Sequence, residues 1–274
     1  MARTPAALSR AAVNSSLALS RLSRLPGVNL PTSLIASSAR AWRGSNVRVH
    51  QPQEVTEITL YEFEGCPFCR VVREVLTELD LDVHIRPCPA GGRVFREAAE
   101  RLGGKQQFPL LIIEGEAPLY ESADIIARLY ARYGNGQSAP SGLAMRLALA
   151  GSQAASLSRG LAGLRARPSR QPKQPLVLYS FESSPYSRMV RERLCELELP
   201  YRLKNFGKAR ATDIGPPFVR TRFFPDAPVD SRNRREMLAK TGRTQVPYLE
   251  DPNTGAAMFE SRVINNYLES VYAR

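Results

Sequence analysis

One stretch of this chain occurs twice. Residues 60–74, LYEFEGCPFCRVVRE, align without a gap on residues 178–192, LYSFESSPYSRMVRE, at an offset of 118 residues. Both copies join a strand-like apolar run to a helical pattern that begins at a proline, Pro67 or Pro185, which is a favoured first residue of a helix. We therefore expect two domains of the same fold, one after the other.

Each copy continues with the same order of elements. In the first copy, the hydrophobic periodicity and the turn residues predict strand, helix, strand, helix, strand, strand and helix, a βαβαββα order. The later motifs that correspond between the copies are Phe108-Pro109 with Val246-Pro247, and Glu121-Ser122 with Glu260-Ser261. These pairs lie farther apart than 118 residues because a proline-rich and arginine-rich loop, about residues 207–235, is inserted in the second copy. We predict an α/β fold with domains at 55–134 and 176–274.

A C-x-x-C motif, Cys66 to Cys69, lies between the first strand and the first helix. Unpaired N–H groups and the positive end of the helix dipole lower the pKa of a thiol placed there. We predict that Cys66 is a nucleophile and that Cys69, one turn later, is the resolving thiol. The motif supplies only two of the four ligands that a structural zinc ion needs, and the chain has only two histidines, so we expect no metal site.

The other cysteines and the second copy differ from this pattern. Cys195 is expected to pack in the core, and Cys88 is either an alternative resolving thiol or a buried bystander. In the second copy Ser184 and Ser187 replace the two cysteines. That copy has no thiol chemistry of its own at this turn.

The net charge of +12 is concentrated outside the two domains. Residues 1–50 contain seven Arg and no acid, and residues 134–175 contain five Arg, one Lys and no acid. The domains themselves are close to neutral, which argues against nucleic acid as a partner. The composition of residues 1–50 is typical of a transit peptide, which we expect to be disordered and to direct the chain to a chloroplast or a mitochondrion.

Residues 135–175 are predicted to be a basic linker with one helix. An apolar stripe with heptad-like spacing defines that helix: Leu143, Leu147, Ala150, Ala154, Leu157, Leu161 and Leu164. Arg146 and Arg159 argue against a transmembrane span. We expect the stripe to pack on the domains, and a helix lying on a membrane surface is the less favoured alternative.

Three motifs, in the same order in both copies, carry a family resemblance: the turn at Cys66 or Ser184, an X-Pro dipeptide, and a Glu-Ser dipeptide. Each copy resembles a thioredoxin-fold module of the glutaredoxin and glutathione S-transferase N-terminal type. The whole chain resembles the tandem transferase N-terminal domain proteins of plant and algal plastids, which favours the chloroplast.

The resemblance implies that glutathione is a co-substrate. It implies cis prolines at Pro109 and Pro247, with the backbone of Phe108 or Val246 binding the cysteinyl amide of glutathione. It also implies that the Glu-Ser motifs hold the γ-glutamyl end at a helix N-terminus. The residues of those motifs are Glu121, Ser122, Glu260 and Ser261, with Gln107 and Gln245 assisting.

The resemblance favours a glutathione-linked thiol–disulfide oxidoreductase that acts on protein or glutathione mixed disulfides. Three alternatives stay open: glutathione conjugation at Ser184, a non-catalytic glutathione-binding or protein-binding scaffold, and an iron–sulfur cluster shared between subunits. One departure from the glutaredoxin pattern is that Glu62 and Glu64 precede the motif, where a lysine is usual. These carboxylates oppose thiolate formation, and Arg70 and Arg73 are expected to compensate.

Overall fold

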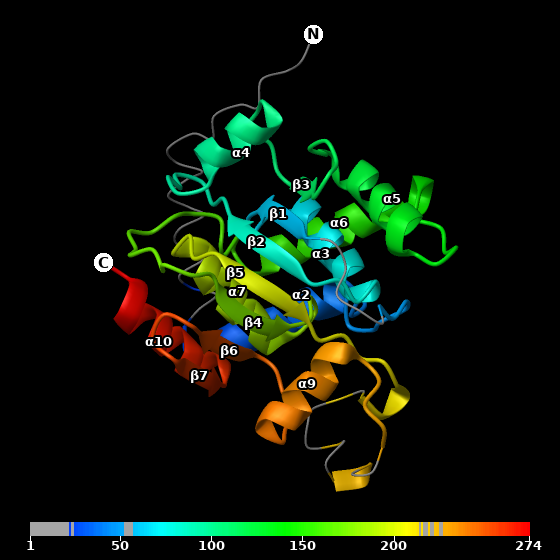
Figure 1. Ribbon diagram of the computed structural model, residues 1–274, viewed down its shortest axis with the longest axis vertical. Coiled ribbons are helices and arrows are strands. Elements are labelled where there is room, and N and C mark those ends of the chain that lie inside the picture. Colours follow the sequence, from blue (N-terminus) through cyan, green and yellow to red (C-terminus); the bar gives the residue numbers. More distant parts are fainter. Residues whose placement is uncertain are drawn as a thin grey trace.

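The computed structural model describes residues 22, 25–51, 57–213, 215, 219, 222–224 and 227–274. Within these residues, the strands form one seven-stranded sheet in the order β3-β1-β2-β5-β4-β6-β7 (Figure 1). The strands are β1 (Ile58–Glu62), β2 (Val83–Pro87), β3 (Leu110–Ile113), β4 (Leu176–Ser180), β5 (Tyr201–Asn205), β6 (Tyr248–Asp251) and β7 (Ala256–Phe259). The predicted α/β class with two thioredoxin-like modules is confirmed.

The helices divide between the two modules and the segments that precede them. They are α2 (Asn29–Ala39), α3 (Pro67–Glu78), α4 (Arg96–Gly103), α5 (Ser122–Tyr133), α6 (Gly142–Ser158), α7 (Pro185–Glu196), α9 (Arg232–Thr241) and α10 (Ser261–Tyr272), with a short 3-10 helix η1 (Ala211–Asp213). We call residues 58–133 module 1 and residues 176–272 module 2. The edge strand predicted in module 1 at Leu119 is only a single bridge to Leu111, because the chain turns into α5 immediately afterwards.

The two modules are joined through β2 and β5, which pair antiparallel. His84 lies opposite Arg202, and these two residues are equivalent at the repeat offset of 118. An approximate two-fold axis therefore passes between them. Without this pairing β2 and β5 would each be an exposed edge strand, and the pairing satisfies the backbone groups of these two edges.

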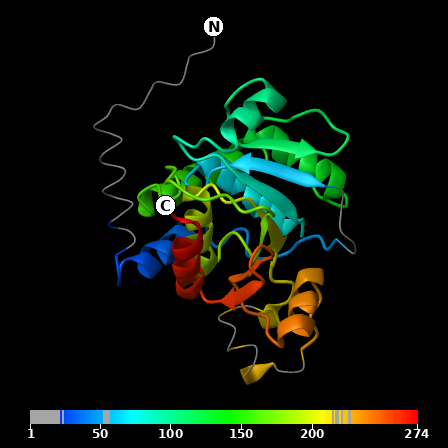
Figure 2. The same cartoon turned by 60° about the vertical axis from the view of Figure 1, so that its left-hand side comes forward.

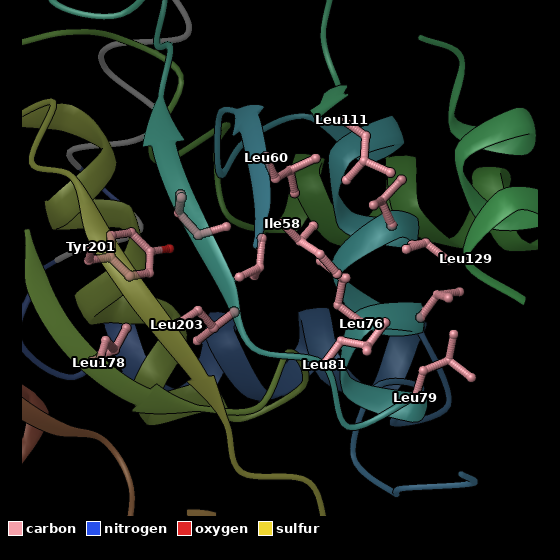
Figure 3. Packing of buried hydrophobic residues seen from close by; sticks show 14 of the residues in the cluster. Ile58, Leu60, Leu76, Leu79, Leu81, Leu111, Leu129, Leu178, Tyr201 and Leu203 are labelled. Carbon is pink, nitrogen blue, oxygen red and sulfur yellow. The ribbon is translucent and has the colours of Figure 1, made fainter. Parts of the chain in front are cut away.

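The apolar core continues across this junction (Figure 3). Ile58 and Leu60 of β1 pack with Leu76 of α3, and the same buried cluster includes Tyr201 and Leu203 of β5. The helices α3 and α7 begin at Pro67 and Pro185 as the sequence predicts. Apolar residues at helical spacing then place one face of each helix on the sheet.

The prediction that residues 1–50 are disordered is wrong for residues 25–50. Helix α2 packs against α6 and α7, and Ser33 and Ser37 at its buried face are completely covered. Arg40 binds Glu74 with two hydrogen bonds, Nε to Oε1 at 2.7 Å and Nη2 to Oε2 at 2.8 Å. A segment without acids is therefore held by a carboxylate of module 1. Residues 1–21 of the predicted transit peptide lie outside the described residues.

The helix predicted in the linker is α6, but the prediction of its packed face is wrong. Leu143, Leu147 and Leu157 are 70%, 63% and 68% exposed. The buried face consists mainly of small residues, including Ser152 and Ala155. Small side chains let α6 approach α2 and α3 closely, because the distance between helix axes depends on the side chains at the contact. In the part of the chain that is described, no helix has the length and apolar character needed to cross a membrane.

The segments around α2 and α6 are themselves a repeat. We call residues 29–49 arm 1 and residues 142–168 arm 2. The identical residues, at an offset of 119, are Leu30 and Leu149, Ser33 and Ser152, Ala36 and Ala155, Ser37 and Ser156, Arg40 and Arg159, Gly44 and Gly163, and Arg48 and Arg167. The backbones also correspond, since Trp42 and Leu161 both have φ of 57°.

The arms are exchanged between the modules. Arm 1 precedes module 1 but packs on α7 of module 2, and arm 2 precedes module 2 but packs on α3 of module 1. Equivalent backbone bridges fix both arms, one from Asn46 to Lys208 and the other from Arg165 to Ala90. Figure 2 shows α2 in blue and the end of α6 in green on the left, away from the sheet.

Candidate active site

Cys66 is the N-cap residue of α3, and its sulfur accepts a hydrogen bond from the backbone N–H of Cys69 at 3.3 Å. Burial raises the pKa of Cys66, but hydrogen bonds from the Cys69 thiol and from the N–H groups of Cys69 and Phe68 outweigh it, so the net pKa is lowered. For Cys69, burial and its hydrogen bond to Cys66 both raise the pKa well above the ordinary value. The pKa of Cys66 is therefore lowered and the pKa of Cys69 raised, which is the order expected for an attacking and a resolving thiol.

Arm 2 covers one side of this turn. Cys66 is only 3% exposed, and a Cβ atom placed on Gly65 would lie 3.2 Å from the carbonyl oxygens of both Leu161 and Ala162. Ser152 of α6 donates a hydrogen bond to the carbonyl oxygen of Pro67 at 2.8 Å. Arm 2 therefore blocks approach to the thiol from the α6 side of the turn.

Three aromatic side chains lie beside the turn. Phe68 is 43% exposed, and Phe63 and Phe108 are half-buried, with their ring centroids 6.3 Å apart in an edge-to-face arrangement. The register that pairs Tyr61 with Leu110 brings Phe108 beside the end of β1, just before the turn. The Phe108–Pro109 bond is cis, which confirms the expectation from the family resemblance.

The Glu121-Ser122 pair lies at the start of α5. Glu121 has φ of 63°, an unusual conformation for a residue other than glycine, and it accepts a hydrogen bond from the side chain of Gln107. The Glu121 side chain makes no capping hydrogen bond to α5, so it does not bind the N–H groups in the first turn of that helix. Such N–H groups favour a carboxylate ligand. Ser122 is buried.

Module 2 repeats the X-Pro and Glu-Ser parts of the site. Val246–Pro247 is cis, Glu260 has φ of 71°, and Gln245 donates to the Glu260 carboxylate. Ser261 is buried at the start of α10, like Ser122 at the start of α5. The Gln–Glu pair is therefore a shared feature of both copies.

The turn of module 2 has the same geometry without a thiol. Ser184 caps α7, and its oxygen accepts the N–H of Ser187 at 3.2 Å. Arm 1 covers this turn: the N–H of Ser183 donates to the carbonyl oxygen of Gly44 at 3.3 Å, and the hydroxyl of Ser183 contacts that of Ser45. Ser184 is almost completely buried.

A network of buried charges lies between the two turns. Arg73 of α3 binds Glu62, Glu64 and, across the module boundary, Glu182. Arg191 of α7 binds Glu64 at 3.1 Å and Glu182 at 3.0 Å. Burial raises the pKa of Glu182, but the charges of Arg191, Arg73 and Arg70 outweigh it and hold the pKa at about 2.

The network is not electrically symmetric, because Ser180 in module 2 stands where module 1 has Glu62. Burial raises the pKa of Glu62 to about 7. Burial likewise lowers the pKa of Arg188 to about 9, and this guanidinium donates to the carbonyl oxygen of Ser33 at 2.6 Å and to the hydroxyl of Ser37 at 3.0 Å. Glu62 and Glu64, expected from the sequence only to oppose thiolate formation at Cys66, are members of this network. The R-x-x-R-E pattern occurs in both copies, at residues 70–74 and 188–192, and this repetition is the sequence feature that indicates a charge network shared by the two copies.

The remaining cysteines are buried away from solvent. Burial raises the pKa of Cys88, and its thiol donates a hydrogen bond to the carbonyl oxygen of Arg86 at 3.5 Å. Cys195 packs in the core as predicted, and its thiol also donates to the carbonyl oxygen of Gly163 at 3.1 Å, thereby contacting arm 2. Among the described residues, no cluster of three or more His, Cys, Asp or Glu side chains is arranged to hold a metal ion.

Comparison with known families reports the same duplication. The family model described as glutathione S-transferase, N-terminal domain, matches residues 60–138 and again residues 178–274, together more than half of the chain. A comparison with curated proteins found no match.

Proposed function

Since this chain belongs to the family of glutathione S-transferase N-terminal domains, we propose that it is a glutathione-linked thiol–disulfide oxidoreductase with Cys66 as its reacting thiol. One observation carries the proposal. Cys66 sits at the N-cap of α3, and its pKa is lowered although the side chain is buried. Hydrogen bonds to the thiolate overcome the cost of burial there, and the thiolate is the reactive form.

The proposed reaction begins with the Cys66 thiolate attacking the glutathionyl sulfur of a mixed disulfide. The disulfide of the substrate breaks, its own thiolate leaves and takes up a proton, and Cys66 becomes bound to glutathione through a new disulfide. A glutathione thiolate then attacks that disulfide, releasing oxidised glutathione and the Cys66 thiolate. In the alternative second step, Cys69 attacks Cys66, glutathione leaves, and two further glutathione molecules reduce the internal disulfide.

We place glutathione on the aromatic side of the turn. The backbone of Phe108, before the cis Pro109, would bind the cysteinyl amide of glutathione. The γ-glutamyl end would lie at Glu121 and Ser122, where the first turn of α5 attracts its carboxylate. Support for this placement comes from the β1–β3 register, which brings Phe108 to the turn.

For module 2 we propose a structural role rather than conjugation at Ser184. Ser184 and Ser187 replace the two cysteines, so module 2 has no thiol at this turn, and the Ser184 hydroxyl serves as a buried helix cap. Val246, Pro247, Glu260 and Ser261 preserve the rest of the site, so a glutathione-binding scaffold role is the second candidate.

Reduction of a glutathionylated peptide tests the proposal. We expect Cys66→Ser to lower the rate by at least about 100-fold, because hydroxyl groups do not perform this exchange. Cys69→Ser should retain turnover through the glutathione-dependent second step. Ser184→Ala is the matched control in the other copy and should stay within about twofold of the unmodified protein. Turnover that survives Cys66→Ser would refute the proposal, and glutathione conjugation lost on Ser184→Ala would establish the alternative.

We also propose that the residues ahead of α2 direct the chain to the chloroplast. Their composition, rich in arginine and free of acids, supports an organelle leader, and the resemblance to plastid proteins favours the chloroplast over the mitochondrion. Because α2 packs on both α6 and α7, a cleaved leader would have to end before Asn29. Mass spectrometry of the N-terminus of the imported protein measures this directly, and a terminus beyond Ala39 would contradict the proposal.

A further inference from the structure

Arg188 of α7 carries a buried guanidinium that no carboxylate pairs with. The residue is 1% exposed, and it forms no ion pair with an Asp or Glu of the described residues. Its equivalent in module 1, Arg70, lies 3.3 Å from a carboxylate oxygen of Glu182. Arginine is almost never fully buried without a partner, because removing an unpaired charge from water is costly. The positive charge of Arg188 therefore calls for a counter-charge of another kind.

The free donors of Arg188 lie along one edge of the guanidinium. Its hydrogen bonds to described residues all come from Nη1, which donates to the carbonyl oxygen of Ser33 at 2.6 Å and to the hydroxyls of Ser33 and Ser37 at 3.2 and 3.0 Å. Nε is buried and has no acceptor among these residues. Arg40 and Arg159 each use Nε and Nη2 to bind both oxygens of a carboxylate. Arg188 presents the same two-donor edge without a carboxylate.

The charge network between the two turns is one negative charge short. In module 1, Arg73 contacts Glu62, whereas its equivalent Arg191 donates from Nη1 to the hydroxyl of Ser180 at 2.8 Å. Serine thus replaces a carboxylate in the second copy. The network consequently sets four arginines against three carboxylates, namely Arg70, Arg73, Arg188 and Arg191 against Glu62, Glu64 and Glu182.

The unbalanced charge lies at Arg188. Burial is the largest cause of the lowered pKa of this guanidinium, and the charge of Arg70 is the next. The two arginines are equivalent in the repeat, so the approximate two-fold axis brings like charges near each other. Glu182 and Glu64 act on Arg188 in the opposite sense, but both are bound by Arg191. Nε of Arg70 is also buried without an acceptor among the described residues.

We propose that a small monovalent inorganic anion, of the size of chloride, binds at the Nε and Nη2 edge of Arg188. The ion supplies the negative charge that Ser180 does not, and it accepts charge-assisted hydrogen bonds from this edge. A compact ion needs the least room in this position, which Ser33 and Ser37 of arm 1 cover from one side. Because the ion binds only the folded chain, it stabilises the protein. The proposal does not depend on the redox function of Cys66.

Urea unfolding of the full chain at constant ionic strength and about pH 7 tests this proposal. Sodium chloride replaces sodium gluconate, whose anion is too large for a buried site of this kind. We expect the equilibrium constant for unfolding to fall about tenfold between zero and about 0.2 M chloride, which corresponds to one site with a Kd of about 20 mM. Arg188→Met should lose this chloride dependence. Arg101→Met is the matched control and should keep it, because Arg101 is exposed.

Bromide locates the site directly and does not depend on any variant folding. Crystals of the unmodified protein grown in sodium bromide should show an anomalous difference peak within hydrogen-bonding distance of Nε of Arg188. Chloride dependence that Arg188→Met retains, or that Arg101→Met loses equally, overturns the proposal. Stability that does not change with chloride overturns it too, as does a bromide map without a peak at this edge.

Discussion

Arg73 of module 1 donates from Nε to Oε2 of Glu182 in module 2 at 2.9 Å. The equivalent arginine of module 2, Arg191, donates from Nε and Nη2 to Glu64 of module 1 at 3.2 and 3.1 Å. The two modules are therefore joined by reciprocal charge pairs beneath the turns that carry Cys66 and Ser184. The arms reinforce the same junction, because each packs on the module that it does not precede.

Replacing Arg73 by methionine should destabilise the protein by about 3 to 5 kcal/mol. The substitution leaves buried carboxylates without their main partner, and removing one member of a buried ion pair costs that much. Urea unfolding measures the change. Arg101→Met is the control, since Arg101 and Glu97 form an exposed pair at 3.8 Å, and its loss should cost no more than about 1 kcal/mol. Equal effects for the two variants would show that the buried network contributes nothing special.

Gly163→Ala should destabilise the protein more than Gly91→Ala. Both glycines have positive φ, 80° and 78°, so an alanine at either position costs about 1 to 2 kcal/mol of backbone strain. Only at Gly163 would the added Cβ also meet a neighbour, lying 2.8 Å from the Cβ of Glu64, whereas Gly91 has nothing within 4 Å. Thermal unfolding compares the two variants. A smaller effect at Gly163 would contradict the close packing of arm 2 on module 1.

Asp80→Asn should stabilise the protein at pH 8 relative to its effect at pH 5. Burial, followed by the charge of Asp82, raises the pKa of Asp80 to about 7, above the value of about 3.9 in an unfolded chain. The folded state therefore binds this proton more tightly, so stability is present below the unfolded pKa and is lost as the pH rises through about 7. Asparagine carries no charge and tolerates the φ of 53°.

The expected gain at pH 8 over pH 5 is about 1 to 3 kcal/mol. Urea unfolding of both proteins at the two pH values measures it, and the pH 5 comparison serves as the control for changes in packing. The nearby charged groups are Arg232 and, at 3.8 Å, the half-exposed His50. A variant whose gain is the same at both pH values would show that Asp80 does not titrate in this range.

Ser152→Ala should speed alkylation of Cys66 by iodoacetamide about threefold to tenfold. The hydroxyl of Ser152 anchors α6 to the carbonyl oxygen of Pro67, and a net contribution of about 1 kcal/mol per hydrogen bond makes opening of arm 2 more frequent by that factor. The repeat offers a matched control, because Ser33 makes the equivalent 2.7 Å bond from arm 1 to Pro185. Ser33→Ala should leave the rate unchanged, and acceleration by both variants alike would point to general loosening instead.

The two modules and their local features can be predicted from the sequence. The helices begin at Pro67 and Pro185, and the turn residues cap them, because capping and the preference of proline for the first helical turn depend on neighbouring residues. The cis prolines followed from the family resemblance. The βαβαββα order followed from hydrophobic periodicity, which acts within each element, and it is complete in module 2, whereas module 1 keeps only the Leu111–Leu119 bridge of its last strand.

The position and packing of the two arms depend on tertiary contacts that the sequence pattern does not reveal. Arm 1 was predicted to be a disordered leader because it has no acids of its own, yet its Arg40 binds Glu74 and its Ser37 binds the backbone of Ser183. On α6, the heptad-like spacing identified residues that share a face, but spacing does not state which face is covered. Close packing of small residues placed Ser152 inside and Leu147 outside. Contacts between residues distant in the chain decide burial, and they exist only once both modules and both arms are assembled.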